Sequence, residues 1–218
     1  MILPEKYDMK HKIIKSVLKC LLIMDNFVYS LISKYSVKLE RGLHPKHRLT
    51  KYHEFFLKNI NNSDSVLDIG CGNGYNTSRL AEKAARVTGI DIDADNISVA
   101  KQKYHMDNIE YITGDATSYL FNEKFDVIIL SNVLEHIEER VGFLRKVKGL
   151  GSKILIRVPM LDREWKVLYK KEFGIEYRLD KTHVTEYTFQ ELVKELRDAG
   201  LKIHEYTIRF GEIWAAAR

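Results

Sequence analysis

Apolar and polar positions follow two alternating spacings from Ser65 onward. Apolar runs of strand length are separated by segments whose apolar residues recur at helical spacing. This alternation is typical of a parallel sheet with helices on both faces and right-handed crossovers. Strands are expected at 65–69, 86–91, 109–112, 126–131 and 153–158, and helices at 75–85, 94–104 and 138–147.

The stretch after Pro159 is less regular, because charged and aromatic residues mix there without a clear period. A helix is expected to return before Gly200, since glycine suits the end of a helix. The last apolar runs predict a hairpin that adds two strands to the sheet. The expected bounds are 186–199 for this helix and 201–209 and 212–217 for the strands, with the turn near Gly211.

The N-terminal segment is helical in pattern. Apolar residues in 13–32 recur at the spacing of an amphipathic helix. This helix could cover the domain, pair with a second copy as a homodimer, or rest on a membrane surface, and the first two uses are favoured. Because polar residues interrupt the stretch, it should not span a bilayer. The interrupting residues are Lys15, Lys19, Asp25 and Asn26.

The net charge of +5 is concentrated at the N-terminal end. Residues 1–60 hold 12 Lys and Arg against 5 Asp and Glu, whereas the remainder holds 23 against 25. Lysines at helical spacing are more often a solvated face than a docking site, and no recognition motif accompanies them. Nucleic acid is therefore not an expected partner. We expect a helical segment or lid over 1–60 and a single globular domain over 61–218.

The two cysteines, Cys20 and Cys71, lie far apart, and neither has a C-x-x-C partner. They predict neither a disulfide framework nor a structural zinc site. A reducing, cytoplasmic location fits this cysteine usage.

The stretch "VLDIGCGNG" places Gly70, Gly72 and Gly74 between the first expected strand and the first expected helix. Ligands of open α/β sheets bind at this end of the strands. Glycines let the backbone turn sharply and approach a ligand closely. The dinucleotide fingerprint needs its third glycine one position later, where Tyr75 stands. The loop therefore predicts a ligand other than a dinucleotide.

Polar residues at the ends of the next strands narrow the ligand. Asp91 ends the second strand, where a carboxylate accepts hydrogen bonds from ribose hydroxyls. Asp115 closes the third strand and is placed to accept from an adenine amino group. The fourth strand, in "FDVIILSNVLEHI", ends in Ser131 and Asn132. Together these positions indicate an adenosine-bearing ligand.

The motifs "VLDIGCGNG", "GIDID", "GDA" and "FDVIILSNVLEHI", in this order, resemble class I S-adenosylmethionine-dependent methyltransferases with small-molecule acceptors. The resemblance covers 65–160. It implies a Rossmann-like, doubly wound α/β fold with a seven-stranded, mostly parallel sheet whose last strand is antiparallel, plus the N-terminal helical segment. The implied cofactor is S-adenosylmethionine, which leaves as S-adenosylhomocysteine. The implied cofactor-binding residues are Asp68, Gly70, Gly72, Gly74, Asp91, Ile92, Asp115, Ala116, Ser131 and Asn132.

Methyl transfer from a sulfonium needs alignment above all, but a hydroxyl acceptor must also lose its proton. Histidine is the usual proton acceptor near neutral pH. We expect His136 to be this base, oriented by Glu135, although the pair could instead only cap the following helix. His183 is expected to hold the substrate near the start of the late helix, with Thr185 as the N-cap.

Some relatives carry a Glu-x-x-Glu-His run after the fourth strand and bind a divalent cation there. This chain reads Asn132-x-x-Glu135-His136, so an amide replaces one charged ligand. Glu135, His136 and His183 remain as a reduced set of ligands. The sequence therefore does not favour a metal.

Contacts to the acceptor are expected from segments that flank the core. Their polar, aromatic and basic residues suit a sugar or glycan precursor, although the same charges could form a salt-bridged lid. The pattern, including "RFGEIWA", is similar to uncharacterised methyltransferases associated with surface polysaccharide synthesis. The alternatives are a lipid or quinone acceptor at the membrane surface and a cofactor-binding module without turnover. The expected acceptor residues are Tyr52, His53, Arg157, Arg163, Tyr169 and Arg178.

Overall fold

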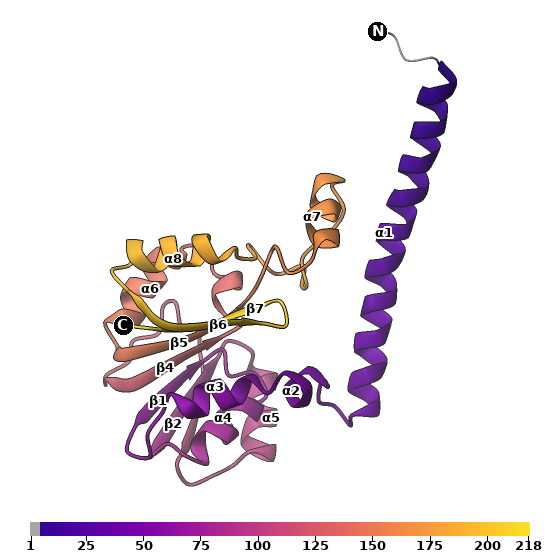
Figure 1. Cartoon of the computed structure of the whole chain (residues 1–218). Coiled ribbons are helices and arrows are strands. Elements are labelled where there is room, and N and C mark those ends of the chain that lie inside the picture. The colour runs from indigo at the N-terminus through magenta and orange to yellow at the C-terminus, as the bar shows by residue number, and fades with distance from the viewer. Residues whose placement is uncertain (1–4) are drawn as a thin grey trace. The chain divides into compact units, whose positions relative to one another are not determined.

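The strands of the computed structural model, which describes residues 5–218, form one sheet in the order β3-β2-β1-β4-β5-β7-β6 (Figure 1). Neighbours among β1 to β5 are parallel, and β7 lies antiparallel between β5 and β6. This confirms the expected Rossmann-like fold class. The strands are β1 (Ser65–Ile69), β2 (Arg86–Asp91), β3 (Ile109–Thr113), β4 (Phe125–Ser131), β5 (Gly151–Pro159), β6 (Ile203–Arg209) and β7 (Glu212–Ala217).

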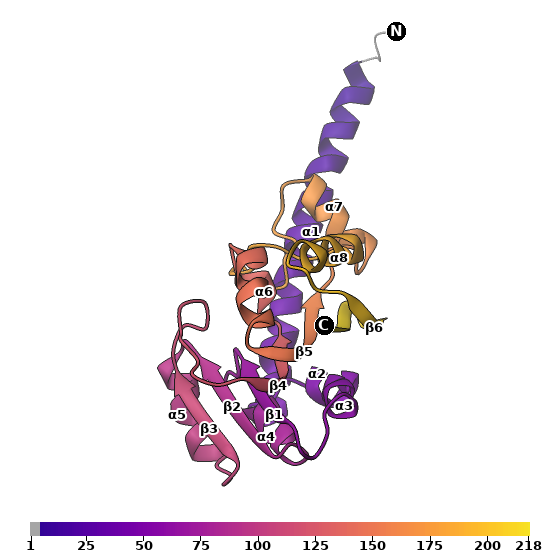
Figure 2. The ribbon, with the colours of Figure 1, turned by 90° about the vertical axis from the view of Figure 1, so that its left-hand side faces the viewer.

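Helices cover both faces of the sheet. Figures 1 and 2 show α6 and α8 on one face and α3 and α4 on the other. Side chains of β4 alternate between the two faces, as the period of a strand requires. Ile128 and Leu130 belong to the apolar core beneath α6 and α8, and Val127 and Ile129 belong to the core beneath α3 and α4. The helices are α3 (Tyr52–Lys58), α4 (Tyr75–Ala81), α5 (Ala94–Lys103), the 3₁₀ helix η1 (Leu134–His136), α6 (Arg140–Lys148) and α8 (Phe189–Asp198).

The N-terminus of α8 corrects one prediction. Its N-cap is Thr188, whose hydroxyl accepts from the backbone N–H of Glu191, while the Glu191 carboxylate accepts from that of Thr188. The expected cap, Thr185, lies too early because Tyr187 first pairs with the end of β5, donating to the Pro159 carbonyl. That extended pairing delays the helix, so His183 lies in a loop before it rather than at its start.

The chain divides into two compact units. The larger unit comprises Thr50–Arg163 and Thr182–Arg218 and contains the sheet, and the smaller comprises the described residues up to Leu49 with Glu164–Lys181. The expected division into 1–60 and 61–218 stays a prediction.

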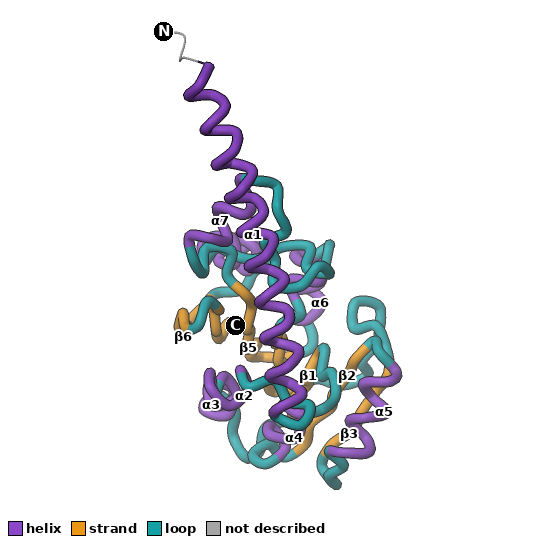
Figure 3. The backbone as a smooth tube through the Cα atoms, turned by 90° about the vertical axis from the view of Figure 1, so that its right-hand side faces the viewer, coloured by secondary structure: helices purple, strands orange, loops and turns teal. Residues whose placement is uncertain are grey.

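The smaller unit contains α1 (Glu5–Leu39), longer than the helix expected over 13–32, and α7 (Trp165–Glu172), which the irregular sequence pattern did not reveal. Figure 3 shows α1 as one unbroken helix. A short helix, α2 (Lys46–Thr50), follows it. By length and composition, α1 could cross a membrane, and the expectation that it does not stays a prediction.

Candidate functional site

The loop between β1 and α4 folds back over the end of β2. The backbone N–H groups of Gly70 and Cys71 donate to the Ile90 carbonyl, at N···O distances of 2.8 and 3.1 Å. The N–H of Gly72 donates to Asp91 Oδ2 at 2.8 Å. The second strand therefore fixes the course of the glycine loop.

All three glycines of the loop have positive φ, at 68°, 53° and 83°. A Cβ on Gly70 would lie 2.8 Å from Val133 Cγ2, and one on Gly74 would lie 2.7 Å from the Tyr111 hydroxyl. Packing therefore excludes side chains at both positions. A Cβ on Gly72 would meet no protein atom within 4 Å. The tip of the loop at Gly72 thus faces open space, into which a bound molecule could approach the backbone.

Carboxylates surround this loop. Asp68 is buried beneath it and accepts a hydrogen bond from the Thr77 hydroxyl at 2.7 Å. Burial raises the pKa of Asp68 to about 7, against the lowering effect of the Thr77 hydroxyl. Asp91 accepts from the N–H of Gly72 and, through Oδ1, from that of Asp93 at 2.9 Å. Ile92, beside it, is 73% exposed, so an apolar surface is available next to this carboxylate.

The loop after β3 is fixed from two directions. Asp115 Oδ1 accepts from the hydroxyl and the N–H of Thr117, and the hydroxyl bond holds the pKa of Asp115 below its usual range. Lys146 of α6 donates to the carbonyls of Ala116 and Thr117. A cleft of about 450 Å³ opens between this loop and α6. It is lined by Thr117, His136, Ile137, Glu138, Glu139, Gly142, Phe143 and Lys146.

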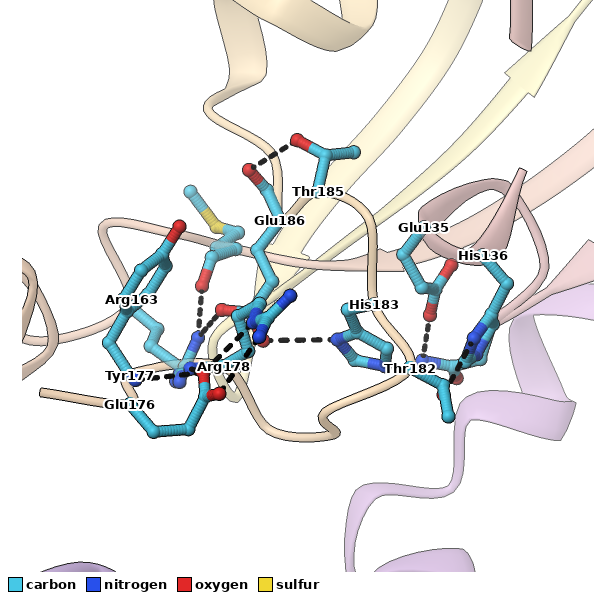
Figure 4. Close-up of polar contacts among 12 residues, drawn as sticks. Glu135, His136, Arg163, Glu176, Tyr177, Arg178, Thr182, His183, Thr185 and Glu186 are labelled. Carbon is cyan, nitrogen blue, oxygen red and sulfur yellow. Dashed lines mark hydrogen bonds and ion pairs between the residues drawn. The ribbon is translucent and has the colours of Figure 1, made fainter. Parts of the chain in front are cut away.

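Glu135, His136 and His183 come together beyond the end of β4 (Figure 4). Each can offer a ligand atom such that all of these atoms lie within 4.8 Å of one another. The two imidazole rings meet edge to face, with centroids 4.8 Å apart. The backbone N–H of Val184 donates to the Glu135 carbonyl at 2.7 Å and so fastens the late loop to η1.

Neighbouring polar groups orient the three side chains. Asn132 Nδ2 donates to Glu135 Oε1 at 2.7 Å, whereas the buried Oε2 has no hydrogen-bond partner. Burial raises the pKa of Glu135 to about 7, and the Asn132 hydrogen bond opposes that rise. Nδ1 of His136 lies 3.1 Å from the Thr182 hydroxyl. The neutral and ionised forms of Glu135 are therefore both accessible near neutral pH.

The sequence did not single out Glu186, which completes this cluster. Its buried carboxylate lies 3.1 Å from His183 Nδ1 through Oε1 and pairs with Arg163 through Oε2. The i,i+3 spacing of His183 and Glu186 was the available signal. Arg163, which the sequence predicted to contact the acceptor, thus pairs with the Glu186 carboxylate that orients His183.

Two imidazoles and a carboxyl group can do two kinds of chemistry. They can accept and pass a proton, or they can ligate a divalent cation such as zinc or manganese. The unpartnered oxygen of Glu135 fits either use. The expectation of no metal therefore stays a prediction.

Tyr52 and Arg157 form a second cluster, buried below the end of β5. Arg157 Nε donates to Glu212 Oε2 at 2.7 Å, and a second guanidinium nitrogen pairs with Oε1. The guanidinium carbon lies 3.9 Å from the centroid of the Tyr52 ring. Trp214 Nε1 also donates to Glu212, at 3.0 Å. His53, next to Tyr52, holds a buried Nδ1 without a hydrogen-bond partner.

The other expected acceptor residues, Tyr169 and Arg178, belong to the smaller unit. Arg178 forms an ion pair with Glu176 at 2.8 Å. The Tyr169 ring packs against Trp165 and Phe173. Contact of either residue with an acceptor stays a prediction.

Residues 67–152 match a family model described as a methyltransferase domain. The chain is 28% identical over 210 residues to an uncharacterized protein of Methanocaldococcus jannaschii, covering 83% of this chain and 76% of that one. It is 27% identical over 203 residues to the ubiquinone biosynthesis O-methyltransferase of Stutzerimonas stutzeri, covering 84% and 87%.

Solved structures share the fold at low sequence identity. Magnesium protoporphyrin IX methyltransferase from Synechocystis, with bound S-adenosylhomocysteine, superposes with a TM-score of 0.63 at 20% identity, covering 79% of this chain and 82% of that one. The N-methyltransferase NodS from Bradyrhizobium japonicum, in complex with the same molecule, gives 0.60 at 19% identity, covering 78% and 86%.

Proposed function

Since the chain is an S-adenosylmethionine-dependent methyltransferase of small molecules, we propose that it methylates a hydroxyl oxygen of its acceptor, with His136 as the general base. One observation carries the proposal: a buried carboxyl group with an unpartnered oxygen lies beside two imidazoles beyond the end of β4. A hydroxyl acceptor must give up its proton during methyl transfer, and this cluster can supply the base that takes it.

The cofactor supplies a methyl group on a sulfonium, which is activated without help from the protein. The chain has to hold it. We assign this role to Asp68, to the glycine loop and to Asp91, with Ile92 and the Asp115–Ala116 loop against the adenine and Ser131 and Asn132 towards the reacting methyl. The open space at Gly72 and the exposed surface of Ile92 support this assignment.

Proton removal falls to His136, which is one of the residues that line the cleft beside α6. The Thr182 hydroxyl, 3.1 Å from Nδ1, holds its ring. As the ring takes the proton from the acceptor oxygen, the nearby Glu135 carboxylate, in its ionised form, stabilises the imidazolium. The pKa of Glu135, about 7, makes this ionised form accessible near neutral pH. The imidazolium then releases the proton to solvent. His183, held by Glu186, is assigned to position the acceptor.

The charge of the acceptor can be inferred from the partners of the arginine side chains near the site. The sequence favours a sugar or glycan-precursor hydroxyl, and Arg157 and Arg163 were expected to recognise it. Both guanidinium groups contact carboxylates of the chain, Glu212 and Glu186, which favours an uncharged acceptor over an anionic one. A phenolic hydroxyl of a quinone precursor is the second candidate, favoured by the ubiquinone biosynthesis O-methyltransferases among the relatives.

The test incubates the full chain and a methyl-labelled cofactor with panels of sugar-based and phenolic acceptors, and locates the label by mass spectrometry. We expect label on oxygen. His136→Ala should lower kcat by about 10²- to 10⁴-fold at unchanged cofactor affinity, the usual contribution of a general base. His183→Ala should raise KM more than it lowers kcat, and His204→Ala, on β6, is the matched control.

Two results would contradict the proposal in different ways. Full activity of His136→Ala, together with label on nitrogen or carbon, would remove the base and the hydroxyl acceptor. Loss of activity on chelation, restored by zinc or manganese, would instead assign the cluster to metal ligation.

A further inference from the structure

The long helix of the smaller unit has an apolar side that no residue of that unit covers, within the stretch 9–39 whose side chains the structure describes. The large apolar side chains on this side are between 36% and 63% exposed. They recur at intervals of three, four or seven residues, which places them on one side of the helix. We call them the apolar face of α1: Ile13, Val17, Met24, Phe27, Leu31 and Tyr35.

The opposite side of α1 is held by the segment 164–181. Asp25 lies 3.1 Å from Lys166 Nζ and 2.6 Å from Lys170 Nζ. Asn26 accepts from Lys170 through Oδ1 and donates through Nδ2 to the Glu176 carbonyl at 2.6 Å. The hydrogen bonds from the two lysines hold the pKa of Asp25 below its usual range. The polar residues in the middle of α1 therefore turn towards their own unit, away from the apolar face.

These contacts decide between crossing a bilayer and lying on one. The helix is long and apolar enough to cross by composition. A crossing would place Asp25, Lys166 and Lys170 in the hydrocarbon core, or would break their contacts and leave Asp25 unpaired there, and either arrangement is costly. A helix that lies in the interface plane buries only its apolar side and keeps the Asp25 contacts.

The charges on α1 favour a lipid surface over a second copy of the helix as the partner of the apolar face. Between residues 9 and 39, lysines flank the apolar face at both ends, and Asp25 is the acidic residue. The heptad positions that would continue the face as a coiled-coil seam are Lys10, Lys34 and Lys38, so the seam spans fewer than three heptads. Two such helices would place like charges together, whereas an anionic bilayer attracts them.

We propose that the apolar face of α1 docks the protein on an anionic lipid bilayer, with the helix in the plane of the surface. Phe27 and its neighbours enter the boundary between headgroups and acyl chains, and the flanking lysines contact anionic headgroups. The proposal is independent of the acceptor and of the methyl-transfer chemistry, because docking requires neither.

The test floats the full chain with vesicles of phosphatidylcholine containing 30% phosphatidylglycerol, and with vesicles of phosphatidylcholine alone. We expect binding to the anionic vesicles, release at high salt, and at least a tenfold lower partition coefficient for Phe27→Glu and Leu31→Glu. Leu120→Glu, at an 82% exposed apolar position of the larger unit, should bind as the wild type does. Lys19→Glu with Lys34→Glu should weaken binding, whereas Lys101→Glu with Lys103→Glu should not.

Unchanged circular dichroism and cofactor affinity show that each variant is folded. Three outcomes overturn the proposal: no flotation at any lipid composition, flotation that Phe27→Glu leaves unchanged, or resistance of the membrane-bound protein to alkaline carbonate, which marks a spanning helix. A dimer seen by light scattering and dissociated by Phe27→Glu, without vesicle binding, would assign the face to a second copy.

Discussion

The buried pair of Arg157 and Glu212 tests whether Arg157 serves the acceptor, as its sequence position suggested, or the fold. The side chain of Arg157 is 3% exposed, and that of Glu212 is 11% exposed. The guanidinium is held by two nitrogens against the carboxylate and lies over the Tyr52 ring. Replacing Arg157 by Met keeps most of the aliphatic stem but leaves the Glu212 carboxylate with the Trp214 N–H as its remaining partner in this cluster.

The expected magnitude follows from this geometry. Breaking a buried ion pair by removing one partner costs about 3–5 kcal/mol of unfolding free energy, because the other charge stays buried without compensation. The lost contact with the Tyr52 ring adds about 1–2 kcal/mol. The double variant Arg157→Met with Glu212→Leu leaves no charge behind and should lose less than about 2 kcal/mol. A double-mutant cycle should therefore give a coupling energy of about 3 kcal/mol or more.

Urea unfolding followed by circular dichroism measures these values, and Arg197→Met, exposed on α8, should stay within about 0.5 kcal/mol of the wild type. For a chain of this length the single variant should also melt roughly 8–28 °C lower. If Arg157→Met unfolds like the wild type while KM for the acceptor rises, the guanidinium serves the substrate and the structural interpretation is wrong.

Three further predictions concern the cofactor side and the late helix. Burial raises the pKa of Asp68 to about 7, so the folded state keeps a proton that the unfolded chain releases from about pH 4 upward. The unfolding free energy should therefore fall between about pH 4 and 7, and Asp68→Asn should reduce that slope in urea titrations. Asp91→Ala should weaken cofactor binding by about 1.5–3 kcal/mol in calorimetry, and Gly72→Val should abolish it; wild-type affinity in either would move the site elsewhere. Thr188→Ala should cost about 1 kcal/mol of stability and Thr185→Ala much less, and equal costs would contradict the observed cap.

The sheet could be predicted closely because its strands are buried by local runs of apolar residues. β1, β2 and β7 have the expected bounds, and β5 is longer by a few residues at its ends. The late helix was placed less well, because its start depends on pairing between Tyr187 and the end of β5, which are distant in sequence. The missed α7 is short, and mixed charges around it hide its period.

The candidate site was also easier to predict where it is built from residues close in sequence than where it depends on distant ones. The glycine loop and Asp91 follow one another along the chain, so their motifs could be recognised before their geometry was known. The cluster of His136 and His183 needs a loop that returns from beyond β5, and its geometry rests on hydrogen bonds from the backbone N–H groups of Val184 and Thr185 to the Glu135 carbonyl. Sequence could name both histidines, but it could not show that Glu186 holds one of them.

Asn132 shows how a departure from a motif acquires a physical reason. Compared with the Glu-x-x-Glu-His run of some relatives, an amide at this position looked like a lost ligand. In the structure its backbone has a φ of 59°, and its amide nitrogen donates to Glu135 Oε1 at 2.7 Å. A carboxylate here could not donate, and its charge would repel Glu135 and raise the pKa of that group further. The amide therefore fixes one oxygen of Glu135 and opposes the rise in its pKa that burial causes, so the ionised carboxylate stays accessible near neutral pH.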